Sequence, residues 1–252
     1  MIHFVGAGPG APDLITLRAA ELLKTADAIV YAGSLVNPAL LDYAKNGCEI
    51  HNSARMTLDE VIAVLLRVHR AGGMAVRLHT GDPSIYGAIR EQMDLLKAGG
   101  VPYDVCPGVS SFCAAAAALK AEYTLPQVSQ SVIITRMAGR TPVPVKESIA
   151  SFAAHGATMV IFLSAQMAEA LQRELLSGGY SADTPAAIVY KASWPDEKVF
   201  RCTVGTLAET AAQSGVSNLA LILVGGFSGD DYELSKLYDP AFTTAFRRGK
   251  EV

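Results

Sequence analysis

Residues 2–10 read Ile-His-Phe-Val-Gly-Ala-Gly-Pro-Gly, a short apolar run followed by three glycines within five positions. Apolar and β-branched residues that stop at glycine predict a buried strand over Ile2–Val5 that ends in a turn. Residues Leu17–Lys24 then show helical spacing, with Thr16 as the N-cap. The start of the chain therefore predicts a strand–turn–helix unit of an α/β fold.

Similar units follow along the chain. Thr57 and Glu60 have the spacing of a capping box, which predicts a helix from that point. A linker is expected over about residues 121–129, between domains at 1–120 and 130–252. Further strands are predicted at Ala28–Tyr31, Met74–Leu78, Tyr103–Cys106, Ser131–Thr135, Thr158–Leu163, Ala186–Tyr190, Lys198–Thr203 and Leu219–Val224, and further helices at Ala88–Lys97, Phe112–Leu119, Ala165–Leu176 and after a second capping box at Thr206–Glu209.

This alternation predicts two α/β domains with mainly parallel sheets and a cleft between them. The polar residues after Phe227 give no clear structural prediction. Half of the 252 residues are hydrophobic, and the net charge is only −3. Such a chain can form a core, and it lacks the basic field that nucleic-acid binding requires.

The cysteines, histidines and apolar runs allow predictions about the cellular compartment of the protein and about bound metal. The four cysteines form no Cys-x-x-Cys pair, and the five histidines are scattered. We therefore expect free thiols in a reducing cytoplasm and no bound metal. The apolar runs are too short to span a bilayer, and the first residues do not have the pattern of a signal peptide.

The glycine turn alone allows a nicotinamide site. Gly6, Gly8 and Ala11 satisfy the pattern G-x-G-x-x-A of dinucleotide-binding enzymes. That pattern requires a helix that begins within the turn, whereas the cap signal here comes later, at Thr16. It also requires an acid after the second strand, where this chain has Ala32-Gly33-Ser34. An NAD(P)-dependent oxidoreductase remains the alternative function.

Four segments in order resemble the tetrapyrrole methyltransferase family. They are the glycine turn with Asp13-Leu14-Ile15-Thr16, then Thr80-Gly81-Asp82-Pro83-Ser84-Ile85-Tyr86-Gly87, Pro107-Gly108-Val109-Ser110-Ser111, and the strand Leu219–Gly225. Two more segments, at 31–36 and 135–144, resemble the branch of this family that methylates C-11 of precorrin-4 or its cobalt form. Met137 departs from that pattern, because we expect a more polar residue there.

The resemblance implies a homodimer that uses S-adenosyl-L-methionine as methyl donor and releases S-adenosyl-L-homocysteine. A non-catalytic ligand-binding module on the same scaffold is a further alternative. For Asp82, Ser110 and Ser111, helix capping is the alternative to ligand binding. Donor contacts implied by the resemblance are Pro9, Thr80, Gly81, Asp82, Ile85, Ser110, Ser111, Leu163, Ala192 and Ala220.

The implied substrate is an anionic tetrapyrrole, so an acidic enzyme must bind it with local cations. Arg136 and Arg140 are the first candidates and Arg55 the next, with solvated surface charge as the alternative. Tyr86 could polarise the macrocycle, although a buried hydrogen-bonded tyrosine is the other interpretation. Methyl transfer from a sulfonium needs alignment rather than a nucleophilic side chain, so no catalytic residue is assigned.

Overall fold

The computed structural model describes residues 1–229 and 231–250. They form two compact units. The first comprises Met1–Ala115 together with Lys191–Glu197, and the second comprises Ala116–Tyr190 and the described residues from Lys198 onward. The change of unit thus falls within the alanine-rich helix α4 (Ser111–Leu119), ahead of the expected linker at 121–129.

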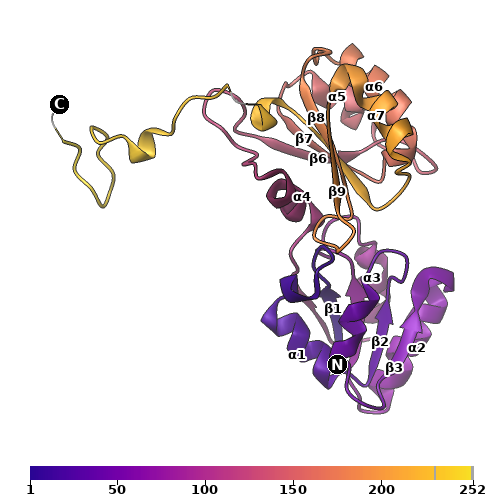
Figure 1. The fold of residues 1–252 in the computed structure, drawn as a ribbon. Helices are drawn as coiled ribbons and strands as arrows, with labels where there is room; N and C mark the ends of the chain where they lie inside the picture. The colour runs from indigo at the N-terminus through magenta and orange to yellow at the C-terminus, as the bar shows by residue number, and fades with distance from the viewer. Residues whose placement is uncertain (230, 251–252) are drawn as a thin grey trace. The chain divides into compact units, whose positions relative to one another are not determined.

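The first unit contains a sheet of five parallel strands in the order β3-β2-β4-β1-β5 (Figure 1). Parallel pairing places the carboxyl ends of all five strands at one edge. The strands are β1 (Ile2–Gly6), β2 (Ala28–Tyr31), β3 (Glu49–Asn52), β4 (Ala75–His79) and β5 (Tyr103–Cys106). β3 was not predicted, because its residues Glu-Ile-His-Asn lack an apolar pattern.

Helices cover both faces of this sheet. α1 (Leu17–Thr25) packs on one face through Ala19 and Leu23. The opposite face is covered by α2 (Leu58–Arg70) and α3 (Ile89–Ala98). Both predicted N-caps in this unit are confirmed. The Thr16 hydroxyl accepts from the Ala19 amide at 3.2 Å, and Thr57 and Glu60 form the capping box.

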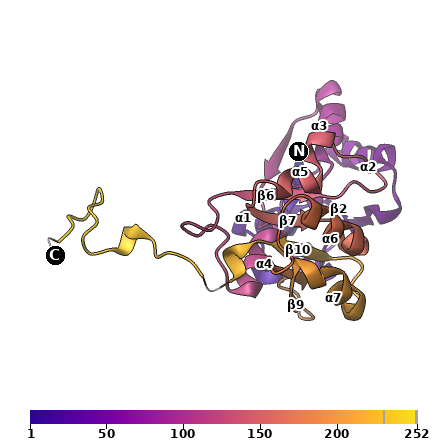
Figure 2. The ribbon, with the colours of Figure 1, turned by 90° about the horizontal axis from the view of Figure 1, so that it is seen from above.

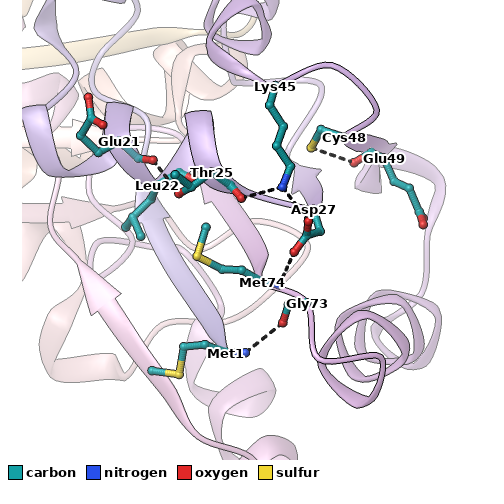
Figure 3. Close-up of polar contacts among 10 residues, drawn as sticks. All are labelled: Met1, Glu21, Leu22, Thr25, Asp27, Lys45, Cys48, Glu49, Gly73 and Met74. Atoms are coloured by element: carbon teal, nitrogen blue, oxygen red, sulfur yellow. Dashed lines mark hydrogen bonds and ion pairs between the residues drawn. The ribbon is translucent and has the colours of Figure 1, made fainter.

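Hydrogen bonds tie together the amino-terminal ends of the strands (Figure 3). The Asp27 carboxylate accepts from Lys45 Nζ at 2.6 Å and from the Met74 amide at 2.7 Å. Lys45 Nζ also donates to the Thr25 carbonyl at 3.1 Å, and the amino terminus donates to the Gly73 carbonyl at 3.1 Å. This edge of the sheet is closed by structural contacts, which leaves the carboxyl edge for loops with other roles.

The second unit has a mixed sheet in the order β6-β7-β10-β8-β9, covered on one face by α5, α6 and α7 (Figure 2). The predicted fold of two α/β domains is confirmed, but in this sheet only β6 and β7 pair in parallel. β8 and β9 form a hairpin and β10 inserts antiparallel between β7 and β8. The elements are β6 (Val132–Arg136), α5 (Ile149–Ala153), β7 (Thr158–Phe162), α6 (Ala168–Ser177), β8 (Pro185–Tyr190), β9 (Lys198–Thr203), α7 (Leu207–Ser214) and β10 (Ala220–Val224).

The second predicted capping box was wrong. Thr206 makes no side-chain cap to α7, and the box instead joins Thr203 and Thr206. A 3-10 turn over Val204–Thr206 directly precedes the helix. Thr206 is thus the N-cap position of α7, but its hydroxyl oxygen accepts from the Thr203 amide and not from an amide of α7. A threonine spaced three residues from a glutamate does not by itself fix which turn it caps.

After η7 (Gly226–Ser228), the described C-terminal segment contains only one short 3-10 helix, at Lys236–Tyr238. Arg247 organises this segment by donating to the carbonyls of Leu237, Asp239 and Phe242. Among the described residues, none of the helices combines the length and apolar character needed to span a bilayer.

Two buried polar residues of β4, Arg77 and His79, lie on the face of the first sheet that α2 and α3 cover. Arg77 donates to the Gln92 side chain at 3.2 Å and to the Val30 carbonyl at 3.1 Å. His79 is 4% exposed, and its Nε2 has no hydrogen-bond partner among the described residues. Burial, reinforced by the Arg77 charge, lowers the pKa of His79 from 6.5 to about 3. His79 is therefore neutral in the folded protein at neutral pH.

The depressed pKa predicts a loss of stability in acid. Between pH 6.5 and 3 the unfolded chain protonates this imidazole and the folded chain does not. The free energy of unfolding should therefore decrease as the pH is lowered, by up to about 1.4 kcal/mol per pH unit in this window. We expect His79→Phe to lose about 1–2 kcal/mol less than the wild type between pH 7 and pH 5 in urea unfolding. His155 is exposed, so His155→Gln is the matched control; equal losses in all three proteins would contradict the prediction.

Candidate functional site

Three loops meet at the carboxyl edge of the first sheet. They follow β1, β4 and β5, which are neighbours in the sheet. The glycine turn after β1 pairs with the loop after β4 through two backbone hydrogen bonds, Gly81 amide to Gly8 carbonyl at 2.8 Å and Gly8 amide to Gly81 carbonyl at 3.2 Å. The two segments that carry half of the predicted donor contacts thus form one structure.

The three loops can approach one another this closely because glycines lie at their contact. A Cβ on Gly6 would lie 2.6 Å from the Cα of Gly108 and 2.7 Å from the carbonyl oxygen of Gly81. A Cβ on Gly108 would lie 2.2 Å from that same oxygen. Since contacts this short are not tolerated, alanine at either position would push the loops apart. The contact between these loops is therefore made by backbone atoms.

Asp82 joins the loop after β4 to the loop after β5. One carboxylate oxygen accepts from the Gly108 amide at 2.8 Å, and the other accepts from the Ser84 amide at 2.9 Å and from the Ser84 hydroxyl. Partial burial acts to raise the pKa of Asp82, but these hydrogen bonds outweigh it and hold the pKa below its ordinary value. Asp82 is consequently a carboxylate at neutral pH.

Helix capping does not account for Asp82. The following helix, α3, begins only at Ile89, with Ala88 at its N-cap. Asp82 instead opens a tight turn in which the Ile85 amide donates to the Asp82 carbonyl at 3.2 Å. The same loop ends in two left-handed residues that are not glycine, Tyr86 (φ 54°) and Ala88 (φ 49°). Backbone of this kind costs energy and is concentrated at functional sites.

The other predicted donor contacts of the first unit lie around this centre. Ser111 begins α4, and a Cβ on Gly81 would lie 3.4 Å from its amide and 3.5 Å from the Cα of Ser110. Thr80 lies between β4 and Gly81, and Pro9 is buried in the glycine turn. Ala192 is buried in the 191–197 loop, which belongs to this unit.

The remaining predicted residues lie together in the second unit. Parallel pairing sets Arg136 opposite Phe162, beside Leu163, and antiparallel pairing sets Ala220 opposite Tyr190. Because Ile222 pairs with Ile161, Ala220 and Leu163 lie at the same end of the sheet. Leu163 is 62% exposed in a left-handed conformation (φ 55°). The sequence-predicted residues thus form two groups, one in each unit.

The two arginines of the loop after β6 differ in their contacts. The Arg136 guanidinium donates to the carbonyls of Met137, Thr141 and Pro142 at 3.1, 3.2 and 2.8 Å, so it organises its own loop. Arg140, four residues later in that loop, is exposed. Met137 is apolar because it is buried in the core, with its amide bonded to Ser164 Oγ at 3.0 Å.

In the first unit, Arg55 is exposed in the 3-10 turn that follows β3, at the carboxyl edge of the sheet. Tyr86 is 45% exposed, so it is not the buried tyrosine of the alternative interpretation. Within residues 1–229 and 231–250, no three His, Cys, Asp or Glu side chains gather in an arrangement that could hold a metal ion.

Sequence reasoning did not identify three residues that hold the glycine turn in place. Asn37, Ser193 and Trp194 each hydrogen-bond to its backbone. Two of them are more than 180 residues away along the chain, so no local pattern points to them. The one available signal was that Trp194 is the single tryptophan of the sequence.

Comparison with known proteins agrees with this architecture. The family model for tetrapyrrole (corrin/porphyrin) methylases matches residues 1–208. The cobalt-precorrin-4 C(11)-methyltransferase of Methanocaldococcus jannaschii is 51% identical over 98% of this chain and 96% of its own length.

Two solved structures are also similar. That of a cobalt precorrin-4 methyltransferase has a TM-score of 0.88 and 46% identity, and the match covers 90% of this chain and 95% of the other. That of uroporphyrin-III C-methyltransferase from Thermus thermophilus, complexed with S-adenosyl homocysteine, has a TM-score of 0.75 and 28% identity, over 90% and 93% of the two chains.

The contacts of Asp82 predict a structural cost when its carboxylate is removed. Asp82→Ala leaves the Gly108 amide without its partner, and the loss of a hydrogen bond to a charged group costs about 1.5–3 kcal/mol. We expect a lower free energy of unfolding by urea denaturation, with Asp82→Asn intermediate because its amide oxygen can still accept one bond. Asp59, exposed on α2, is the control as Asp59→Ala. Wild-type stability in Asp82→Ala would show that the Gly108 contact is not made in solution.

Proposed function

Because the chain belongs to the family of tetrapyrrole (corrin/porphyrin) methylases, we propose that it transfers a methyl group from S-adenosylmethionine to C-11 of cobalt-precorrin-4 or precorrin-4, a step of cobalamin biosynthesis. The observation that carries the proposal is the similarity to cobalt-precorrin-4 methyltransferases over nearly the whole chain, on a site whose three loops carry the segments that resemble the family.

The carboxyl edge of the first sheet fits the proposed donor. A relative of the same fold is known in complex with S-adenosyl homocysteine. Gly6, Gly81 and Gly108 let the three loops pack backbone against backbone beside Asp82, which brings the segments that resemble the family to one place. The anionic carboxylate of Asp82 suits a cationic ligand, and its oxygens have further capacity to accept from ribose hydroxyls.

The chemistry asks the protein mainly for alignment. S-adenosylmethionine supplies a methyl group on a sulfonium, which is a good leaving group without acid assistance. The residues around Asp82 and Gly81 would orient the donor, and positioning of this kind contributes roughly 7–11 kcal/mol to catalysis. Pro9, Thr80, Ile85, Ser110, Ser111, Leu163, Ala192 and Ala220 are proposed as donor contacts together with Gly81 and Asp82.

For the acceptor, we propose cationic contacts from the loop after β6 and from the turn after β3. Arg140 and Arg55 are exposed, so their guanidinium groups can meet carboxylates of an anionic tetrapyrrole. Arg136 supports this role by fixing the loop backbone. We also propose Tyr86 as an acceptor contact, and a homodimer as the assembly.

The alternative oxidoreductase function has less support. A dinucleotide site needs a helix that begins within the glycine turn. Here the turn continues into a 3-10 helix at Pro12–Leu14, and α1 begins at Leu17. The residues after β2 also provide no acid to bind ribose hydroxyls.

Product analysis tests the proposal. The protein is incubated with cobalt-precorrin-4 or precorrin-4 and methyl-labelled donor, and the product is examined by mass spectrometry and carbon NMR. We expect one added methyl group, at C-11, and one equivalent of S-adenosylhomocysteine. Donor binding without turnover would favour a non-catalytic binding module. Saturable heat on titration with NAD would favour the oxidoreductase.

The two arginines of the loop after β6 should have separable effects. Arg140→Ala should raise the KM for the tetrapyrrole about fivefold or more, because a guanidinium–carboxylate contact is worth about 1–3 kcal/mol, while donor affinity stays unchanged. Arg136→Ala should lower both kcat and tetrapyrrole affinity, because the loop loses three internal hydrogen bonds. Steady-state kinetics at saturating donor measures both. Lys146→Ala, exposed and farther along the chain, is the control; wild-type kinetics for Arg140→Ala would remove Arg140 from the acceptor site.

A further inference from the structure

The loop between β8 and β9 folds with the first unit, although both strands belong to the second sheet. This 191–197 loop reads Lys-Ala-Ser-Trp-Pro-Asp-Glu and contains the single tryptophan of the chain. Trp194 is partly buried against the glycine turn. A loop this far along the chain therefore shapes the first turn of the protein.

Three successive residues of the glycine turn are held by side chains from elsewhere. Trp194 Nε1 donates to the Pro9 carbonyl at 3.1 Å. Asn37 Nδ2 donates to the Gly10 carbonyl at 2.9 Å. The Ala11 amide donates to Ser193 Oγ at 3.0 Å. Two of the three contacts come from the 191–197 loop, so the direction of the peptide groups at residues 9–11 depends on it.

The indole ring of Trp194 also packs directly against the backbone of Gly10. A Cβ on Gly10 would lie 1.9 Å from Cδ1 and 2.0 Å from Nε1 of Trp194. The indole edge thus occupies the space that a side chain would need. A glycine is required here because the ring is present, and the ring can approach the backbone because the glycine is present.

Contacts within the 191–197 loop hold it in one conformation. Lys191 (φ 47°) and Ser193 (φ 69°) are left-handed without being glycine. Glu197 Oε2 accepts from the Ser193 amide at 2.6 Å, and Lys191 Nζ lies 5.0 Å from the centre of the indole ring and 2.7 Å from the Asp196 carboxylate. A loop that keeps two unfavourable residues is one whose surroundings impose its conformation.

We propose that Trp194 is a positioning residue for the methyl donor: with Ser193, it fixes the backbone of Pro9–Ala11 in the conformation that binds S-adenosylmethionine. The inference rests on the proposed function. The turn it fixes also pairs with Gly81, next to Asp82, so a displaced turn moves the loops that we assign to the donor. Displacements on the order of 1 Å in a binding site are enough to weaken alignment strongly.

Calorimetric titration with S-adenosylhomocysteine tests the proposal on the full-length chain. Trp194→Phe keeps an aromatic ring on Gly10 but removes the Nε1 donor, and we expect its Kd to rise about fivefold. Trp194→Ala should raise the Kd by more than about tenfold, so phenylalanine rescues in part. Ser193→Ala should resemble Trp194→Phe. In kinetics, the KM for the donor should rise in all three variants, while the KM for the tetrapyrrole stays within about twofold.

Three comparisons make the outcome decisive. Lys198→Ala, exposed just beyond the loop, should bind like the wild type. Thermal unfolding identifies variants that fail to fold. If Trp194→Ala does not fold, the Kd values of Trp194→Phe and Ser193→Ala decide whether the proposal holds. If these variants are folded and bind S-adenosylhomocysteine with wild-type Kd, the positioning role is refuted and the proposed function stands. If the wild type itself neither binds S-adenosylhomocysteine nor methylates the tetrapyrrole, the proposed function fails first.

Trp194 provides an independent readout because it is the single tryptophan. Its emission should change as S-adenosylhomocysteine saturates the wild type, with the same Kd as calorimetry gives. An emission that stays constant through a calorimetrically proven saturation would show that the indole does not sense the donor, and would count against the proposal.

Discussion

Backbone meets backbone at the carboxyl edge of the first sheet, where three loops touch through glycines. Gly6, Gly81 and Gly108 approach one another so closely that a single Cβ would separate them. The two hydrogen bonds between Gly8 and Gly81 then fix the turn after β1 against the loop after β4. Pro9, Thr80, Gly81 and Asp82, which we assign to the donor, lie on the two loops that these bonds join.

The charged side chain of Asp82 provides a further link between these loops. The Asp82 carboxylate accepts from the Gly108 amide and so joins the second loop to the third. Behind the site, Arg77 bonds to Gln92, whose amide donates to the Ala88 carbonyl at 3.0 Å, so a buried cation supports the end of the same loop. Polar groups that are buried and bonded in this way rigidify a site, since each bond that breaks leaves a costly unpaired group.

The two arginines after β6 differ in their contacts, and we propose loop support for Arg136 and substrate binding for Arg140. Arg136 uses its donors on the backbone of its own loop, which keeps a proline-rich segment in one conformation. Arg140 remains exposed on the loop that Arg136 organises. A stiff loop loses less entropy when a ligand binds, so a structural arginine can increase the value of a binding one.

The local sequence determined the elements whose signal is local. The strand and glycine turn of residues 2–10, the caps at Thr16 and Thr57, and the strands and helices other than β3 and α5 could be predicted from spacing and residue type. The ordered glycine and Asp-Pro segments also indicated the family. Prediction failed where the local signal is ambiguous or missing: the Thr206 hydroxyl bonds to Thr203 and does not cap α7, and β3 has no apolar period.

Only the tertiary structure decided which distant groups share a contact. It set Asp82 on the Gly108 amide rather than on a helix, turned Arg136 onto its own loop, and put Met137 in the core. It also brought Trp194 onto Gly10 from the other end of the chain. Residue types determine which contacts are chemically allowed, but pairing between strands far apart in sequence determines which of them form, because a hydrogen bond needs its two atoms within about 3 Å of each other.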